Sequence, residues 1–302
     1  MKTSQLMSCA IGSLLLFTVA AASASHAPKL KLKFKGNNVP GAQQTLPEGI
    51  NNTDVTVGQY QDSSGIYHGY ILQGSSVTTL DHPQGSNTMA NGLPYNGGTA
   101  NVVGVYTNSV GNLEGFLYNN GTFTDIPGPS GAVSSVAQAI NDNGQIAGWF
   151  LDSNGLAHGF LLEGTTYTTI DVPGATNGSY AMGINNKGVI ALSWFDSNGF
   201  QNASLYNGKT FRNIDVPGSV NSWVNGIDNQ DDAVFVLTDG NGLQHGALCT
   251  QCDSRKLRQY YKFNHPNTVN TYGDGINDKQ TISGGYQNQI TGPWLGFEAT
   301  YK

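Results

Sequence analysis

Side chains that carry oxygen recur at one position of this sequence, at an interval of about 45 residues. Six copies of the position are present, and five of them are polar: Glu48, Asn91, Gln138, Asn225 and Asp274, with Met182 in the remaining copy. Carboxylate and amide oxygens that converge on one point are the hard ligands that Ca²⁺ prefers. We therefore predict one calcium site formed by these five residues. The alternative is that they hydrogen-bond water or backbone.

Two histidines depart from the residues found at a nearby position of the repeat. His82 and His265 each precede a proline, where the other copies have a small or apolar residue: Val39, Gly128, Val172 and Val216. Histidine titrates near neutral pH and can take a proton from water, so we predict His82 or His265 as a catalytic base. The alternative is that both are ordinary surface histidines. The repeated histidines His68, His158 and His245 are expected to pack within the scaffold.

The element that must position these side chains is a repeat of four short β-rich runs. Its clearest copy extends from Ala139 to Gly174, with Gly, Asn and Asp residues between the runs. Four strands per repeat at this period are typical of a β-propeller with one blade per copy. We predict a six-bladed propeller in which the first strand of each blade lines a central channel. This arrangement brings the recurrent polar residues into a ring about one axis.

The repeat is out of phase with the ends of the chain. A strand-like segment, residues 30 to 36, precedes the first copy, and the last copy ends at Tyr301 after three strands. Unpaired strand edges promote aggregation, so we predict that residues 30 to 36 supply the missing outer strand beside residues 294 to 300. Leu30, Leu32 and Phe34 alternate with lysines and present one apolar face. The alternative is a solvated basic tail.

The N-terminal residues have the features of a secretory signal peptide. A positive start at Lys2 is followed by an apolar run and by the small residues Ala22-Ser23-Ala24, which predicts cleavage after residue 24. Cys9 precedes the apolar run, which argues against a lipoprotein anchor, and we expect no membrane anchor. The prediction is therefore a secreted protein, extracellular or periplasmic, with residues 25–302 forming a single propeller domain.

The composition narrows the partners of the mature chain. The net charge is −6 and no basic stripe is present, so we expect no nucleic-acid partner, and we expect a monomer. Two cysteines remain after processing, Cys249 and Cys252, in an insertion between the third and fourth strands of the fifth copy. Outside the cytoplasm this spacing predicts a local disulfide.

The repeated phrases resemble those of bacterial extracellular HAF-repeat proteins. There are three such phrases: Gly-Ile-Asn, His158-Gly159-Phe160-Leu161 and Thr169-Ile170-Asp171-Val172-Pro173-Gly174. The resemblance covers nearly the whole mature chain and implies secretion and a β-repeat fold. It implies no particular activity, because the family is defined by its repeat.

Two functions are compatible with these features. The first is a calcium-dependent hydrolase of a lactone or similar ester, with a weaker fold-level similarity to six-bladed calcium-dependent lactonases. The ion would polarise the carbonyl while a histidine activates water. The second is a non-catalytic protein that binds an extracellular glycan or protein. The aromatic residues Tyr180, Trp223 and Tyr272, close to the inner strands, are candidates for stacking on sugar rings in that case.

Overall fold

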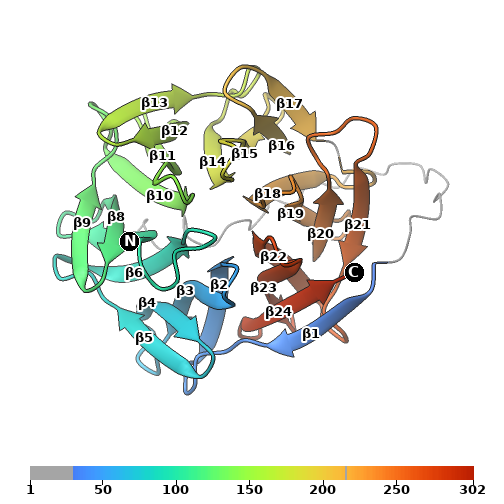
Figure 1. Cartoon of the computed structure of the whole chain (residues 1–302), viewed down its shortest axis with the longest axis horizontal. Helices are drawn as coiled ribbons and strands as arrows, with labels where there is room; N and C mark the ends of the chain where they lie inside the picture. The colour runs from blue at the N-terminus through green and yellow to red at the C-terminus, as the bar shows by residue number, and fades with distance from the viewer. Residues whose placement is uncertain (1–29, 215) are drawn as a thin grey trace.

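Six antiparallel four-stranded sheets are arranged as blades around a central axis in the computed structural model, which describes residues 30–214 and 216–302 (Figure 1). Strands follow one another from the axis outwards in each of blades 1 to 5, and blade 6 completes the ring. The prediction of a six-bladed β-propeller is confirmed. The signal peptide predicted at residues 1–24 lies outside the described residues. In the described part of the chain, no helix has the length and apolar character needed to cross a membrane.

Equivalent strands of the six blades have similar lengths. The inner strands are β2 (Gln44–Ile50), β6 (Gly85–Gly92), β10 (Ser134–Ile140), β14 (Ser179–Ile184), β18 (Asn221–Ile227) and β22 (Asn270–Asn277). The second strands are β3 (Val55–Gln61), β7 (Val102–Asn108), β11 (Ile146–Leu151), β15 (Ile190–Phe195), β19 (Ala233–Thr238) and β23 (Thr281–Gln287). The third strands are β4 (Tyr67–Gln73), β8 (Leu113–Asn119), β12 (Ala157–Glu163), β16 (Gln201–Tyr206), β20 (Gln244–Thr250) and β24 (Leu295–Tyr301). The outer strands are β5 (Ser76–Leu80), β9 (Thr122–Ile126), β13 (Thr166–Ile170), β17 (Phe211–Ile214), β21 (Gln259–Phe263) and, for blade 6, β1 (Leu32–Gly36).

The N-terminal strand closes the ring. β1 pairs antiparallel with β24, with Leu32 opposite Tyr301 and Gly36 opposite Phe297, so the first and last strands lie side by side in blade 6 (Figure 1). Phe34 packs edge-on against Phe297 with ring centroids 5.2 Å apart, whereas Lys33 is exposed. The predicted closure is confirmed, and the alternation of apolar residues with lysines is its physical cause, since one face is buried and the other protects the edge.

Glycine lets the inner strands of neighbouring blades approach each other. The residue before the recurrent Ile is glycine in five blades, at Gly49, Gly92, Gly183, Gly226 and Gly275. A Cβ atom on Gly226 would lie 2.6 Å from the Asp274 carbonyl oxygen, and one on Gly275 would lie 2.8 Å from the Gly49 Cα. Both distances are shorter than real carbon contacts, so these positions require glycine for packing at the axis.

The turns between first and second strands join the blades. In five blades the turn begins with an Asx residue: Asn51, Asn141, Asn185, Asp228 and Asn277. The Oδ1 atom accepts backbone N–H groups of its own turn, as it does in Asn141. In Asn141 the Nδ2 atom also donates to the carbonyl of Asn185 in the next blade, at 3.0 Å. The repeated asparagine therefore shapes the turn and links one blade to the next.

Candidate functional site: the central channel and a pocket between blades 5 and 6

Every recurrent polar residue of the inner strands lies in a β-bulge. The register of β2 with β3 shifts between Pro47 and Gly49, so Glu48 has no residue opposite it, and similar shifts occur in the other five blades. A bulge redirects the side chain of the extra residue. All six side chains consequently line one cavity of about 50 Å³ on the axis: Glu48, Asn91, Gln138, Met182, Asn225 and Asp274.

The two carboxyl groups of this ring contact each other across the boundary between blades 1 and 6. Burial raises the pKa of Glu48 to about 7, against the opposing effect of hydrogen bonds with Gln59 and Asp274. Burial, together with the charge of Glu48, also holds the pKa of Asp274 well above its usual range. Gln59 Nε2 donates to Glu48 Oε1 at 3.3 Å. In the absence of a cation, the pair is therefore expected to share one proton at neutral pH.

The asparagines of the ring, Asn91 and Asn225, donate hydrogen bonds from their amide nitrogens to the neighbouring blade. Asn91 Nδ2 donates to the carbonyl of Ala137 at 3.2 Å, and Asn225 Nδ2 donates to the carbonyl of Gly273 at 3.0 Å. Each amide oxygen is left free of these blade contacts. Among the described residues, no group of three or more His, Cys, Asp or Glu side chains could hold a metal. A cation in the channel would therefore depend on two carboxylates and on neutral oxygens, and calcium binding stays a prediction.

A tyrosine from blade 2 closes the end of the channel where the inner strands finish. Tyr95 is 7% exposed, and its hydroxyl donates to the carbonyl of Ile227 and lies 3.4 Å from the carbonyl of Ile184, in blades 5 and 4. It belongs to a longer turn in which Pro94 replaces the usual asparagine. The repeat pattern did not predict a role for Tyr95, although the departure of the turn from the repeat marks its position.

The aromatic residues near the inner strands pack against one another. Tyr180 lies 5.2 Å from Trp223 and 5.3 Å from Trp149 between ring centroids, and Tyr272 lies 4.9 Å from Trp294. Trp223 and Tyr272 are 5% and 8% exposed. Their rings thus contribute to the core around the channel and present little free face to a sugar.

The two predicted catalytic histidines lie inside their blades. His82 stacks on Tyr106 at a centroid distance of 3.6 Å, and its Nε2 atom lies 3.2 Å from Asp125 Oδ1. His265 stacks on Tyr286 at 3.8 Å. Burial lowers the pKa of both rings. Neither His82 nor His265 is among the described residues that line the central cavity. The structure gives both rings a packing role, and catalysis by either one stays a prediction.

The repeated histidines connect a turn to an outer strand. His68 Nδ1 lies 2.7 Å from Asp81 Oδ1, and its Nε2 lies 3.5 Å from Asp62 Oδ2. Burial alone would lower the pKa of His68, but the hydrogen bonds and charges of Asp81 and Asp62 raise it. His158 makes equivalent contacts with Asp171 and Asp152. This geometry supports the interpretation that these histidines belong to the scaffold.

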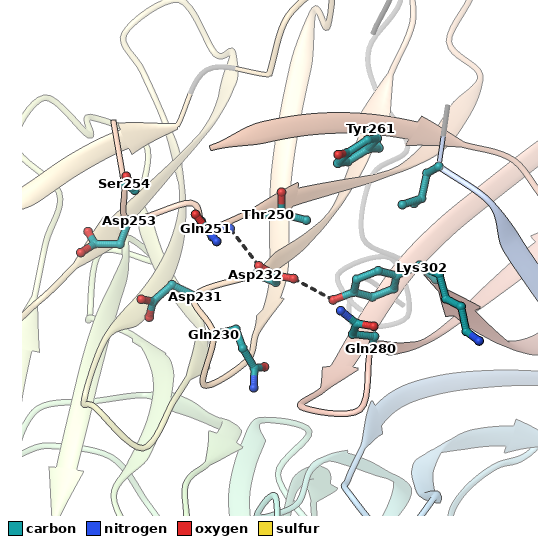
Figure 2. Close-up of a pocket in the computed structure, with 12 residues that line it drawn as sticks. Gln230, Asp231, Asp232, Thr250, Gln251, Asp253, Ser254, Tyr261, Gln280 and Lys302 are labelled. Carbon is teal, nitrogen blue, oxygen red and sulfur yellow. Dashed lines mark hydrogen bonds between the residues drawn. The ribbon is translucent and has the colours of Figure 1, made fainter. Parts of the chain in front are cut away.

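A much larger pocket, of about 800 Å³, lies between blades 5 and 6 (Figure 2). It is formed by the turns after β18 and β22, the end of β20 with the loop that follows it, β21 and the C-terminal residues. The lining residues are Leu30, Gln230, Asp231, Asp232, Thr250, Gln251, Asp253, Ser254, Tyr261, Gln280, Tyr301 and Lys302. The disulfide between Cys249 and Cys252 joins the end of β20 to this loop, which confirms the predicted pairing.

All three carboxylates that line the pocket have partners. Asp232 accepts hydrogen bonds from the Tyr301 hydroxyl at 2.9 Å and from the Gln251 backbone N–H at 2.8 Å, as Figure 2 shows. Asp231 forms an ion pair at 2.8 Å with Lys187, which is not one of the lining residues. Asp253 likewise pairs with an arginine, Arg212, at 2.9 Å. Two of the lining carboxylates are therefore paired with cations, and the third, Asp232, is held by neutral donors.

The sequence analysis also missed this pocket. Its signals are the insertion after Thr250 and the acidic run Asp231-Asp232, which no other copy of the repeat contains. Neither signal shows which blades the loop joins, because the other wall comes from the C-terminal strand. The pocket therefore forms where blades 5 and 6 pack against each other.

Comparison with known proteins agrees with the fold at the level of the propeller class. No family model matches the chain. No curated protein matches it either. Among solved structures, the chain is similar to the SapL1 lectin in complex with alpha methyl fucoside, with 9% identity and a TM-score of 0.56 over 85% of this chain and 92% of that one. It is also similar to AofleA from Arthrobotrys oligospora, with 12% identity and a TM-score of 0.55 over 90% of each chain.

A third similar structure belongs to a different class. The putative TolB from Agrobacterium tumefaciens has 10% identity and a TM-score of 0.59 over 91% of this chain and 99% of that one. The TM-scores show a shared propeller fold, and identities this low leave the activity open. The resemblance to HAF-repeat proteins stays a prediction.

Proposed function

We propose that this chain is a secreted, non-catalytic carbohydrate-binding protein and that its ligand occupies the pocket between blades 5 and 6. The observation that carries the proposal is the contrast in size between the two cavities. Ligand pockets in proteins have volumes of about 300–1,000 Å³. The pocket between blades 5 and 6 has about 800 Å³, whereas the channel cavity has about 50 Å³ and accommodates water or an ion.

The chemistry of the lining favours a polyhydroxylated ligand. Sugar hydroxyls both donate and accept hydrogen bonds, and the amides of Gln230 and Gln280 offer both functions from two opposite turns. Tyr261, on β21, adds a partly exposed aromatic ring that can contact the apolar face of a sugar.

The known lectins support this proposal at the level of the fold. One of the similar structures is the SapL1 lectin in complex with alpha methyl fucoside, and another is a fungal lectin with a six-bladed β-propeller fold, the Aleuria aurantia lectin. The geometry supports binding over hydrolysis of an ester in the channel, because the histidines stack inside the blades and Tyr95 blocks one end. Hydrolysis remains the competing prediction that the experiment must address.

The test is a glycan array followed by titration calorimetry with the best ligand. Replacing Gln230 and Gln280 by alanine and Tyr261 by leucine should weaken binding at least tenfold, or about 1.4 kcal/mol, since these side chains line the pocket. Gln230 and Gln280 are exposed, so the fold should be retained.

The repeat supplies a matched control for this experiment. Asn143 occupies the position in blade 3 that corresponds to Gln230, is also exposed, and lies outside the pocket. Asn143→Ala should leave the affinity unchanged. Unaltered binding by the triple variant, or the absence of any glycan ligand, would refute the proposal. Release of a product from a lactone or ester by the wild-type protein would favour the hydrolase instead.

A further inference from the structure

We propose that Glu48 and Asp274, together with Gln59 and Ser283, bind a divalent cation, with Ca²⁺ as the best fit, at the boundary between blades 1 and 6. The site is distinct from the carbohydrate pocket and does not depend on it. It differs from the predicted ring of five inner-strand ligands, because Gln59 and Ser283 lie on second strands.

The residues of this site are the ones that depart from the repeat. Gln59 on β3 corresponds to Val105, Trp149, Ser193, Val236 and Gly285 in the other blades. Ser283 on β23 corresponds to Val57, Val103, Ala147, Ala191 and Val234. All five other blades therefore build the same contact without an amide at the first position and without a hydroxyl at the second. The polar groups concentrated at this one boundary serve something other than blade packing.

Two buried oxygens beside the carboxyl pair have no hydrogen-bond partner. Gln59 is 4% exposed; its Nε2 donates to Glu48, and its Oε1 is unpaired. Ser283 is fully buried, and its Oγ is also unpaired. A Cβ atom on Gly275, the neighbour of Asp274, would lie 2.6 Å from this Oγ, which places the hydroxyl at the contact between blades 6 and 1. Unpaired buried oxygens of this kind cost about 1–3 kcal/mol each.

A cation accounts for all four side chains at once. A proton shared by the carboxyl pair satisfies Glu48 and Asp274 but leaves the amide oxygen of Gln59 unpaired. Ca²⁺ accepts six to eight oxygens in flexible geometry, so the two carboxylates, the amide, the hydroxyl and water in the adjacent cavity match its needs. The ion would join the first complete blade to the last, at the boundary where the ring closes.

Direct binding of the metal is the test, with no assay of activity involved. Calorimetry of the chelator-treated wild-type protein with CaCl₂ should show one site per chain. At a hundredfold excess over the dissociation constant, Ca²⁺ should raise the melting temperature by on the order of 5 °C, because a ligand of the native state stabilises it by mass action. Glu48→Gln with Asp274→Asn should abolish both effects.

The repeat again provides substitutions that the fold should tolerate. Gln59→Val and Ser283→Ala introduce residues found at these positions in other blades, and each should weaken Ca²⁺ binding about tenfold. Asp196→Asn, which neutralises a carboxylate in an exposed turn, should leave binding unchanged. Failure of the wild-type protein to bind Ca²⁺ would overturn the proposal, since the pair would then hold a proton. Undiminished binding by the Glu48→Gln, Asp274→Asn variant would also overturn it.

Discussion

Asp228 is the residue at which a carboxyl replaces the amide that other blades use. Its Oδ1 accepts backbone N–H groups of the turn, as the asparagines do, but its Oδ2 is buried without a partner. In blade 4 the equivalent Asn185 donates from Nδ2 to the next carbonyl at 3.0 Å. A carboxylate cannot donate, and burial, followed by the charge of Asp232, raises the pKa of Asp228 to about 8. The protonated carboxyl can take over the role of the amide.

Asp228→Asn should therefore stabilise the protein, by about 1–3 kcal/mol at pH 8, since it restores the donor. The pKa of Asp228 is higher in the folded chain than its ordinary value of 3.8, so the native state retains a proton that the unfolded state has lost. Wild-type stability should fall as the pH rises from about 4 to 8. Urea unfolding across this range should show a smaller decline in the variant. Equal pH dependence of the two proteins would contradict this assignment.

Tyr95 is a second residue whose role depends on a single polar group. Its hydroxyl crosses the channel to the carbonyl of Ile227, and the ring fills the end of the channel. Tyr95→Phe keeps the ring and loses the hydrogen bond, so the free energy of unfolding should fall by about 1 kcal/mol. Tyr118→Phe, a substitution on a third strand, is the control and should have little effect. A neutral result for Tyr95→Phe would show that water replaces the hydroxyl.

At the scale of elements, the loop after β20 depends on its disulfide. Cys249 and Cys252 are fully buried and three positions apart, and Thr250, Gln251 and Asp253 beside them line the pocket. Closing so short a loop stabilises the chain by about 2 kcal/mol in the chain-entropy model.

Replacing both cysteines by alanine should lower the free energy of unfolding by about this amount and weaken glycan binding, because the loop that carries the pocket residues is released. Thermal unfolding and calorimetry measure the two effects. The wild-type protein with reductant should behave like the variant. If the variant keeps full affinity, the loop holds its shape without the disulfide and the pocket does not depend on it.

At the scale of the whole molecule, β1 makes an open row of blades into a closed ring. Phe34 contacts Phe297 and His265, with centroid distances of 5.2 Å and 4.9 Å, so its side chain anchors the strand to blade 6. Phe34→Ala should lower the free energy of unfolding by about 2–3 kcal/mol and promote aggregation, since β24 becomes an exposed edge.

Lys33→Ala is the matched control, because Lys33 is the exposed neighbour on the same strand. It should change stability by less than about 0.5 kcal/mol. Chemical unfolding with light scattering distinguishes the two variants. Soluble, fully stable protein after Phe34→Ala would mean that the backbone pairing of β1 is sufficient for closure.

Much of this architecture follows from local sequence. The recurrent Ile, the Asx turns and the glycines encode four strands per copy, because turn chemistry and strand alternation act over a few residues. The number of blades follows from counting the copies. The alternation around Phe34 also predicts the closing strand, since the phase of the repeat leaves one position open beside β24.

The recurrence of polar residues predicted that Glu48 and Asp274 share the channel. The tertiary structure adds the neighbours that the repeat does not indicate: Gln59 donates to Glu48, and Ser283 lies at the contact between blades 6 and 1. The inward stacking of His82 likewise depends on Tyr106, a neighbour on another strand. Periodic patterns specify backbone and burial, whereas the direction of each side chain and the pocket between blades 5 and 6 depend on how strands and blades pack against one another.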